Sequence, residues 1–121
     1  MIKFNLKNKT AIITGGAQGF GLNIAKKFLE FGANVIIWDI DKKELDEASK
    51  SMDNNKLSFN IVDVTNFEQV DQAVKQITKS SNIDILINNA GITGSTTELW
   101  NYDIKEWNKV VEINLMGTFN C

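Results

Sequence analysis

The stretch TGGAQGFG, Thr14 to Gly21, places four glycines within eight residues. Glycine loses more backbone freedom on folding than any other residue, so such a cluster needs a physical reason. The stretch follows a short β-branched run and precedes a segment with helical periodicity, so we predict that it forms the turn from a strand into a helix. The spacing is Gly15-x-x-x-Gly19-x-Gly21, which puts bare backbone at that turn.

Segments typical of strands and helices alternate on both sides of this turn. Each expected helix carries apolar side chains at helical spacing, and Asp41–Glu44 and Thr65–Glu68 have the spacing of capping boxes. The alternation predicts an α/β fold with a doubly wound parallel sheet, strand order 3-2-1-4 and helices on both faces. The third strand alternates polar and apolar residues, which suits an edge. The expected strands are 9–14, 34–39, 57–64 and 83–91, and the expected helices are 19–31, 41–52, 65–77 and a last one from about 103.

Composition sets the broad class of the protein. The chain has 121 residues, of which 43% are hydrophobic and 23% charged, as expected for one globular domain spanning residues 1–121. No apolar run reaches the roughly 18 residues of a membrane span, and the N-terminal segment is too short for a signal-peptide core. We therefore expect a cytoplasmic protein that does not enter membranes. The single cysteine, Cys121, excludes an intrachain disulfide and a cysteine-based metal site.

The charged residues argue against two further kinds of protein, those that bind nucleic acids and those that use histidine in a metal or catalytic site. The net charge is −2, with 13 lysines, no arginine and no histidine. Arginine makes most bidentate contacts to phosphates and base edges, so its absence argues against a nucleic-acid partner. Without histidine, no imidazole can serve as metal ligand or general base, and we expect no metal. If the protein binds a phosphate, backbone amides must make most of the contacts.

The glycine spacing suits a diphosphate. Unpaired amides and the helix dipole favour negative charge at a helix N-terminus. We expect Gly15 to permit the tight turn, Gly19 to let the backbone approach the phosphates, and Gly21 to let the helix pack closely on the first strand. The amides of Gln18, Gly19 and Phe20 are the expected donors. The alternative is a glycine-rich turn without a ligand, and no Gly-Lys-Ser/Thr sequence follows that would indicate a nucleotide-hydrolysing loop.

Asp39 ends the second expected strand, 18 residues after Gly21. That position suits a carboxylate that accepts hydrogen bonds from an adenosine ribose. A carboxylate there would repel the extra phosphate of NADP, and the uncharged Gln18 offers that phosphate no cation, so we expect NAD to be preferred. Lys42 and Lys43 lie nearby and would soften this preference. The alternative is an ordinary aspartate at a strand end.

Together, TGGAQGFG, Asp39, Asp63–Val64 and NNAG at Asn88–Gly91 make the chain resemble the short-chain dehydrogenase/reductase family, along its whole length. It is similar to the 3-oxoacyl-acyl-carrier-protein reductase branch and to the sugar- and alcohol-dehydrogenase branches. The resemblance implies a Rossmann-type fold and NAD(P)-dependent hydride transfer between nicotinamide and a carbonyl or alcohol substrate. It also implies a homo-oligomer in the full-length form.

The resemblance also implies roles for single residues. Asp63 and Val64 would hold the adenine. Asn89, Ala90 and Gly91 would support the glycine turn through Thr14 and run beneath the nicotinamide ribose. Asn114, in the stretch VEINLMGTF, would support the active site through an ordered water. By periodicity it also lies on the helical stripe of Trp107 and Val111, so we expect its amide to be buried and hydrogen-bonded. Taken alone, Asp63 would suit a helix N-terminus, NNAG a turn, and Asn114 a bond to local backbone.

The chain departs from the family pattern in its catalytic residues. The family uses a serine and a tyrosine followed four residues later by a lysine, but the only tyrosine is Tyr102, and Glu106 stands where the lysine would be. Ser95 is not at the serine's place. We therefore expect the N-terminal, cofactor-binding half of such an enzyme, with an open edge on the fourth strand, partial exposure of Trp107 and no turnover by itself. A non-catalytic dinucleotide-binding module and an S-adenosylmethionine-dependent methyltransferase are the alternatives.

Overall fold

The computed structural model describes residues 4–121. Residues 1–3, which belong to the expected domain and N-terminal segment, lie outside the described residues. Helices and strands alternate as expected, with boundaries within a few residues of the predicted ones. The elements are β1 (Thr10–Thr14), α1 (Gly19–Glu30), β2 (Asn34–Asp39), α2 (Lys42–Ser51), β3 (Leu57–Ile61), α3 (Phe67–Thr78), β4 (Ile85–Ile87), η1 (Leu99–Asn101), α4 (Ile104–Val111), η2 (Glu112–Met116) and α5 (Gly117–Asn120).

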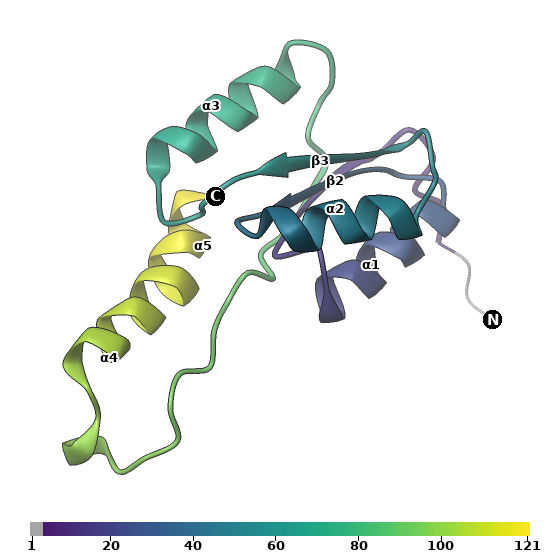
Figure 1. Ribbon diagram of the computed structural model, residues 1–121. Coiled ribbons are helices and arrows are strands. Elements are labelled where there is room, and N and C mark those ends of the chain that lie inside the picture. The colour runs from purple at the N-terminus through teal and green to yellow at the C-terminus, as the bar shows by residue number, and fades with distance from the viewer. Residues whose placement is uncertain (1–3) are drawn as a thin grey trace.

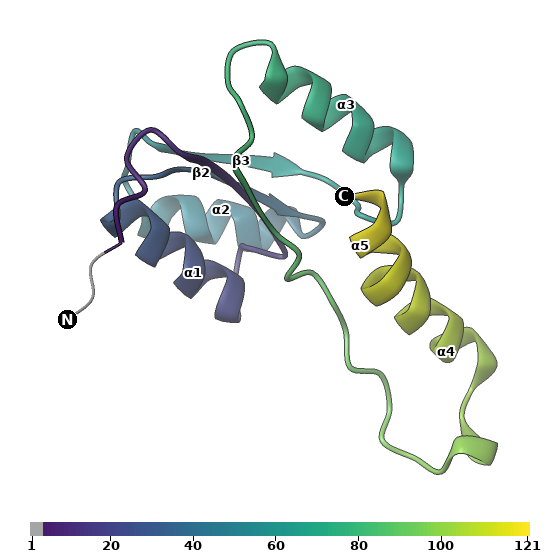
Figure 2. The same ribbon diagram turned by 180° about the vertical axis from the view of Figure 1, so that it is seen from behind.

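The four strands form one parallel sheet in the order β3-β2-β1-β4, which confirms the predicted topology. Helices α1 and α2 lie on one face and α3 on the other (Figures 1 and 2). The strand order reverses direction beside β1, so the carboxyl end of β1 faces a crevice where ligands bind in folds of this kind. The predicted edge position of β3 is confirmed.

Two apolar clusters fill the space between the sheet and its helices. Ile13 and Ile37 belong to the cluster on the α1 and α2 face, whereas Ile12 and Trp38 belong to the cluster on the α3 face. Successive strand residues point to opposite faces, so β1 and β2 contribute to both clusters and are buried on both sides. The indole N–H of Trp38 is buried and has no hydrogen-bond partner among residues 4–121.

The helix starts are mostly set by side-chain caps. Asp41 caps α2 by accepting a hydrogen bond from the Glu44 amide at 3.2 Å, as its sequence spacing predicts. The predicted cap of α3 at Thr65 is wrong: Asn66 accepts from the Gln69 amide at 3.1 Å instead. Phe67 is the first residue of the helix and has 55% of its surface exposed.

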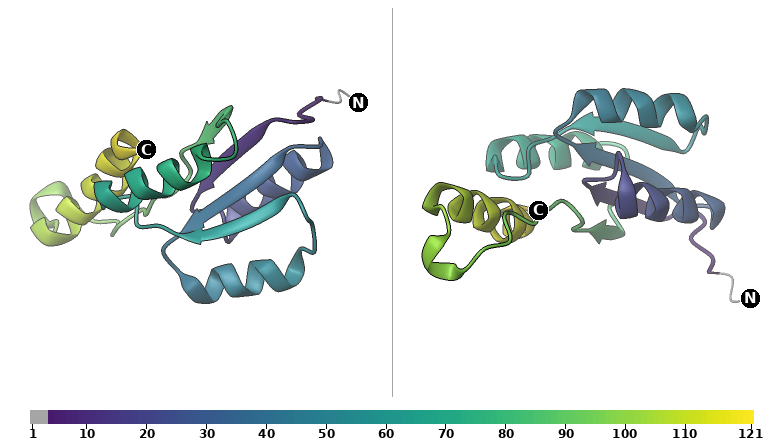
Figure 3. Two further views of the ribbon diagram at one scale, coloured as in Figure 1. Left: turned by 90° about the horizontal axis from the view of Figure 1, so that it is seen from above. Right: turned by 60° about the horizontal axis from the view of Figure 1, so that its bottom comes forward.

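A last helical segment, residues 104–120, comprises α4, η2 and α5 in direct succession, and we call it the C-terminal helix. Its middle part, η2, is a π-helical stretch with wider turns. The segment extends away from the sheet and reaches it only at its C-terminal end, as Figures 1 and 3 show. The expected exposure of Trp107 is confirmed, at 46%. The other large exposed apolar side chains of this segment are Ile104, Val111, Leu115, Met116 and Phe119.

Candidate coenzyme site

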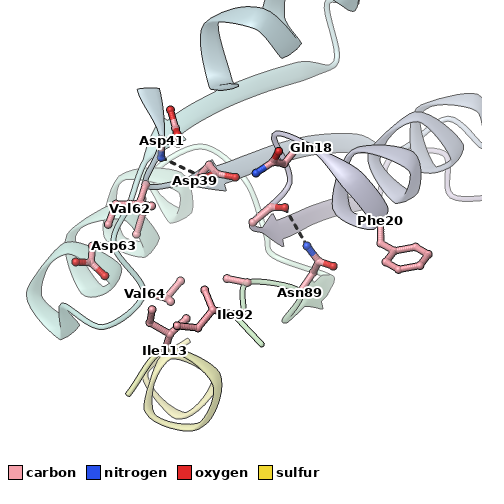
Figure 4. A pocket seen from close by; sticks show the side chains of 14 residues that line it. Gln18, Phe20, Asp39, Asp41, Val62, Asp63, Val64, Asn89, Ile92 and Ile113 are labelled. Carbon is pink, nitrogen blue, oxygen red and sulfur yellow. Dashed lines mark hydrogen bonds between the residues drawn. The ribbon is translucent and has the colours of Figure 1, made fainter. Parts of the chain in front are cut away.

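A cavity of about 480 Å3 lies at the carboxyl ends of β1, β2, β3 and β4 (Figure 4). The structure brings most of the predicted site residues together in its wall, although they come from four separate parts of the chain. Gly19, Gly21 and Asn114 are not in the wall. The lining residues are Gly15, Gln18, Phe20, Asp39, Ile40, Asp41, Val62, Asp63, Val64, Asn89, Ala90, Gly91, Ile92 and Ile113.

Two glycines of the turn adopt backbone that other residues avoid. Gly15 has a φ of 60°, and a Cβ at this position would lie 2.9 Å from the Cα of Ala90. Gly19 has a φ of 57°, but a Cβ there would meet no heavy atom within 4 Å. Gly15 is therefore required by close packing against the turn that follows β4. Gly19 is favoured by its backbone conformation and leaves open space beside the start of α1.

The other two glycines allow close packing. A Cβ on Gly21 would lie 2.5 Å from both Asn89 Nδ2 and the Gly15 carbonyl oxygen. Gly21 thus lets the start of α1 pack closely on the glycine turn directly after β1 and on Asn89. Gly16, to which the sequence analysis assigned no role, would place a Cβ 2.9 Å from Ile37 Cγ2. Its membership in the glycine cluster was the available signal.

The start of α1 differs from the starts of α2, α3 and α4. Gln18 is its N-cap residue but makes no side-chain cap, and the first turn contains no acidic residue. The other three helices are capped by Asp41, Asn66 and Asp103. The first amides of a helix have no partner within it, so α1 offers N–H groups to an anion. The Phe20 ring is 85% exposed and points away from the cavity in Figure 4, which leaves its amide as the useful group.

Asp39 is held in a fixed orientation at the end of β2. Its Oδ2 accepts a hydrogen bond from the Ala17 amide at 3.2 Å, and its Oδ1 accepts one from the Asp41 amide at 3.1 Å. A carboxylate offers about four acceptor positions, so each oxygen retains capacity for a ligand. The same side chain thus joins the glycine turn to the loop after β2.

Asp63 is oriented by two neighbours at the turn after β3. Its Oδ1 accepts from the Thr65 amide at 2.9 Å and from the Thr65 hydroxyl at 2.7 Å. Its own amide donates to Gln69 Oε1 at 2.9 Å. Its Oδ2 takes no hydrogen bond from residues 4–121 and remains available. Sequence reasoning missed Gln69, since its place six residues further on in a helix gives no signal for this bond.

Thr14 joins the two turns of the site. Its hydroxyl accepts from the amides of Asn89 at 3.1 Å and Ala90 at 3.0 Å, and donates to the Ile87 carbonyl at 3.4 Å. Asn89 Nδ2 in turn donates to the carbonyls of Thr14 and Gly15. The support of the glycine turn that the resemblance implied is therefore present in the geometry.

Asn114 is exposed, which corrects the expectation of a buried amide. Both polar atoms of its side chain are nevertheless hydrogen-bonded, because Oδ1 accepts from the Ile92 amide at 2.9 Å and Nδ2 donates to the Ile92 carbonyl at 2.8 Å. The reason is that the C-terminal helix lies beside the loop after β4 rather than against a core. Ile92 and Ile113, which the sequence analysis did not select, line the cavity on this side.

Ser95 and Tyr102, which the sequence analysis compared with the catalytic serine and tyrosine of the family, lie in the segment before α4. Ser95 donates its hydroxyl to Glu106, with oxygen separations of 2.7 and 2.8 Å. Tyr102 packs edge-on against Trp107 and lies close to Gly94, and neither it nor Ser95 lines the cavity. Within residues 4–121, no group of three or more histidine, cysteine or acidic residues could hold a metal ion. In the same range, no helix has the length and apolar character to span a membrane.

Residues 9–121 match the family model described as short chain dehydrogenase. The chain is 37% identical over 121 residues to a 3alpha-hydroxysteroid dehydrogenase of Mediterraneibacter gnavus, covering 96% of this chain and 48% of that protein. It is 40% identical over 119 residues to a 3-oxoacyl-[acyl-carrier-protein] reductase of Chlamydia muridarum, covering 95% and 48%. The chain thus spans about half the length of the curated relatives it matches.

Solved structures agree with the topology. A 3-ketoacyl-(acyl-carrier-protein) reductase from Brucella melitensis, complexed with NADH, superposes with a TM-score of 0.88 at 32% sequence identity. The superposition covers 96% of this chain and 48% of the reductase.

Proposed function

This chain belongs to the short-chain dehydrogenase family, and on that basis we propose that its residues form the coenzyme-binding part of an NAD(P)-dependent oxidoreductase. The observation that carries the proposal is that three features meet at one place. These are the start of α1, which no side chain caps, the Asp39 carboxylate, which is hydrogen-bonded but can accept further hydrogen bonds, and the cavity that both of them border. A nicotinamide dinucleotide fits this donor and acceptor set, because it carries a diphosphate and ribose hydroxyls in one molecule.

The diphosphate would bind at the start of α1. Gly19 and Phe20 supply backbone amides there, and the open space beside Gly19 gives a phosphate room to approach. No side chain of the first turn carries a negative charge that would repel it. The helix dipole adds a favourable field, worth roughly 0.3–1 kcal/mol at an exposed helix end.

The adenosine end would lie between β2 and β3. Asp39 would accept hydrogen bonds from the ribose hydroxyls, and Asp63 Oδ2 would accept from the adenine amino group. Val64 supplies an apolar wall. A negative charge at residue 39 disfavours the extra phosphate of NADP, so we propose NAD as the preferred coenzyme, with Lys42 and Lys43 as the nearest cations along the chain.

The nicotinamide end would lie along Asn89, Ala90 and Gly91. Bound nicotinamide would supply a hydride to a carbonyl or accept one from an alcohol, and the same reaction needs a side chain that donates a proton to the carbonyl oxygen or takes one from the alcohol. The proton donor of the family pattern is a tyrosine, but Tyr102 is outside the cavity wall and is followed by Glu106 at the fourth position. We therefore propose that these 121 residues bind coenzyme without turning over substrate, with Asn114 acting on the cavity only by holding Ile92.

We also propose that the protein acts as a homo-oligomer in its full-length form. The exposed apolar side chains of the C-terminal helix support this, since large apolar patches commonly mark association surfaces. Light scattering across a concentration series tests it, and a monomer at every concentration contradicts it.

Calorimetric titration with NADH and NADPH tests the coenzyme assignment. We expect the protein to bind NADH more tightly than NADPH. Asp39→Ala should weaken the affinity for NADH by roughly 10- to 100-fold and so reduce the ratio between the two affinities. Asp46→Ala, at an exposed position of α2, is the matched control and leaves both affinities unchanged. Binding of S-adenosylmethionine without binding of either coenzyme would overturn the proposal.

A further inference from the structure

The C-terminal helix is tied to two walls of the cavity at once. Asn114 binds the backbone of Ile92 on the β4 side. Six residues later, Asn120 Nδ2 donates to the Val64 carbonyl at 2.9 Å on the β3 side. Ile113, directly before Asn114 in the chain, faces both Val64 and Ile92 in Figure 4. One continuous helical segment therefore contacts both loops that line the cavity at this end.

Gly117 makes the contact with Val64 possible. A Cβ on Gly117 would lie 2.6 Å from Val64 Cγ2, a distance that real Cβ atoms essentially never show. The Gly117 position is buried, and Val64 is 8% exposed. The Val64 side chain thus fills the space that Gly117 leaves, while Asn120 binds its main chain. Both parts of this residue are fixed by the same helix.

The turn that contains Val64 is also anchored at Val62, which is 4% exposed in the apolar cluster on the α3 face. On its strand side, the Val62 amide donates to the Asp39 carbonyl at 3.1 Å. Beyond that bond, Thr65 and Gln69 orient Asp63, but both belong to the same turn or to the helix that follows it. The contacts from Gly117 and Asn120 come from a distant part of the chain. They therefore hold the Val64 end of the turn in place relative to the cavity, whereas the core holds its Val62 end.

We propose that Gly117 and Asn120 are positioning residues for the adenine end of the coenzyme. They hold Val64, and because Asp63 precedes it directly, they also fix the distance between the Asp63 carboxylate and the adenine amino group. This inference rests on the proposed function, since it needs Asp63 and Val64 to contact adenine. Loss of either contact lets the turn move and weakens recognition of the base specifically.

The test compares two ligands that differ only at the base. Reduced nicotinamide hypoxanthine dinucleotide has a carbonyl oxygen in place of the adenine amino group, so position 6 of its base presents an acceptor to Asp63 instead of a donor. We expect the wild-type protein to bind NADH about tenfold more tightly than this analogue, the factor that corresponds to ~1.4 kcal/mol. Asn120→Ala should reduce that ratio to about twofold or less, mainly by weakening NADH. Asn108→Ala, an exposed asparagine on α4, is the control and keeps the wild-type ratio.

A second pair of variants covers the case in which Asn120→Ala does not fold. Gly117→Ala should lower the ratio through the clash with Val64, whereas the same change in a Val64→Ala background should add little. Such non-additivity is the signature of direct contact. A wild-type ratio retained in both Asn120→Ala and Gly117→Ala overturns the inference while leaving the proposed function intact. Failure of the wild-type protein to bind NADH overturns the proposed function, and a wild-type ratio near one overturns the Asp63 assignment.

Discussion

The sheet and the C-terminal helix are held in place by different forces. In β1 every residue is buried, and Ile13 and Ile37 are 0% exposed. In the C-terminal helix, Ile104 and Leu115 are 67% and 64% exposed, although both are as apolar as the strand residues. The sheet gains its stability from removing apolar surface from water, which contributes about 25 cal/mol per Å2. The helix gains little in this way.

Polar contacts, together with the packing of Val64 against Gly117, hold the C-terminal helix instead. Asn114 binds Ile92, Asn120 binds Val64, and Glu106 accepts from Ser95. Each such bond contributes a net of only about 0.5–1.5 kcal/mol, but each has a fixed geometry. The comparison shows that an element which adds little to global stability can still fix the walls of a site.

The largest expected difference between the two regions comes from one substitution made in each. Ile37→Ala should lower the free energy of unfolding by about 2–5 kcal/mol, because it opens a cavity in a closed core. Ile104→Ala, the matched change at an exposed position, should alter it by less than about 0.5 kcal/mol. Urea denaturation followed by circular dichroism measures both. Equal losses would contradict the division into two regions.

Thr14→Val tests the junction of the sheet with the site. Valine has nearly the shape of threonine but lacks the hydroxyl that accepts from the Asn89 and Ala90 amides. We expect the free energy of unfolding to fall by about 1–3 kcal/mol, because Thr14 is 1% exposed and its partners lose their acceptor. NADH titration should show weaker binding in the same variant. Unchanged stability together with unchanged affinity would show that the hydroxyl does not join the two turns.

Asn114→Ala tests the polar attachment of the C-terminal helix. The free energy of unfolding should fall by no more than about 1.5 kcal/mol, since the side chain is exposed. Hydrogen exchange at the Ile92 amide should accelerate well before exchange in β1 changes. Asn108→Ala provides the control. Uniform acceleration across the sheet would mean that the helix contributes to the core after all.

The smallest expected effect on the free energy of unfolding comes from Asp84, the residue directly before β4. The hydrogen bond from the Thr10 amide, opposed in part by desolvation and aided by Lys9, holds the pKa of Asp84 below its ordinary value of 3.8. The ionised form is therefore favoured by folding, and its contribution is present above that value and lost as the pH falls through the lower, folded-state pKa. Asp84→Asn should destabilise the protein slightly at neutral pH and progressively less below pH 3.8. A pH-independent difference would contradict this linkage.

The fold was largely predictable because local patterns and topology agreed. Apolar runs, helix periods and the glycine turn predicted β1 through β4 and their order, since parallel strands with helical crossovers admit few arrangements. The start of α3 was mispredicted because Thr65 and Asn66 are both good capping residues, and only the final geometry selects one.

Site residues that belong to sequence motifs could be predicted. Site residues that reach the cavity only through contacts between distant parts of the chain could not. Gly15, Asp39 and Asn89 lie in recognisable sequence patterns and line the cavity. Ile92 and Ile113 do not, because their places in the wall depend on how the C-terminal helix meets the loop after β4. The exposure of Asn114 was missed for the same reason, as helical periodicity marks a face without saying what covers it.

The three tryptophans make intrinsic fluorescence a probe of the different parts of the molecule. Trp38 is 1% exposed in the sheet and its indole N–H meets no acceptor among the described residues, so its fluorescence should be blue-shifted. Trp100 and Trp107, at 82% and 46% exposed, should emit at longer wavelengths and be accessible to aqueous quenchers. Emission spectra recorded during heating would then distinguish changes around the C-terminal helix from unfolding of the sheet, without any added label.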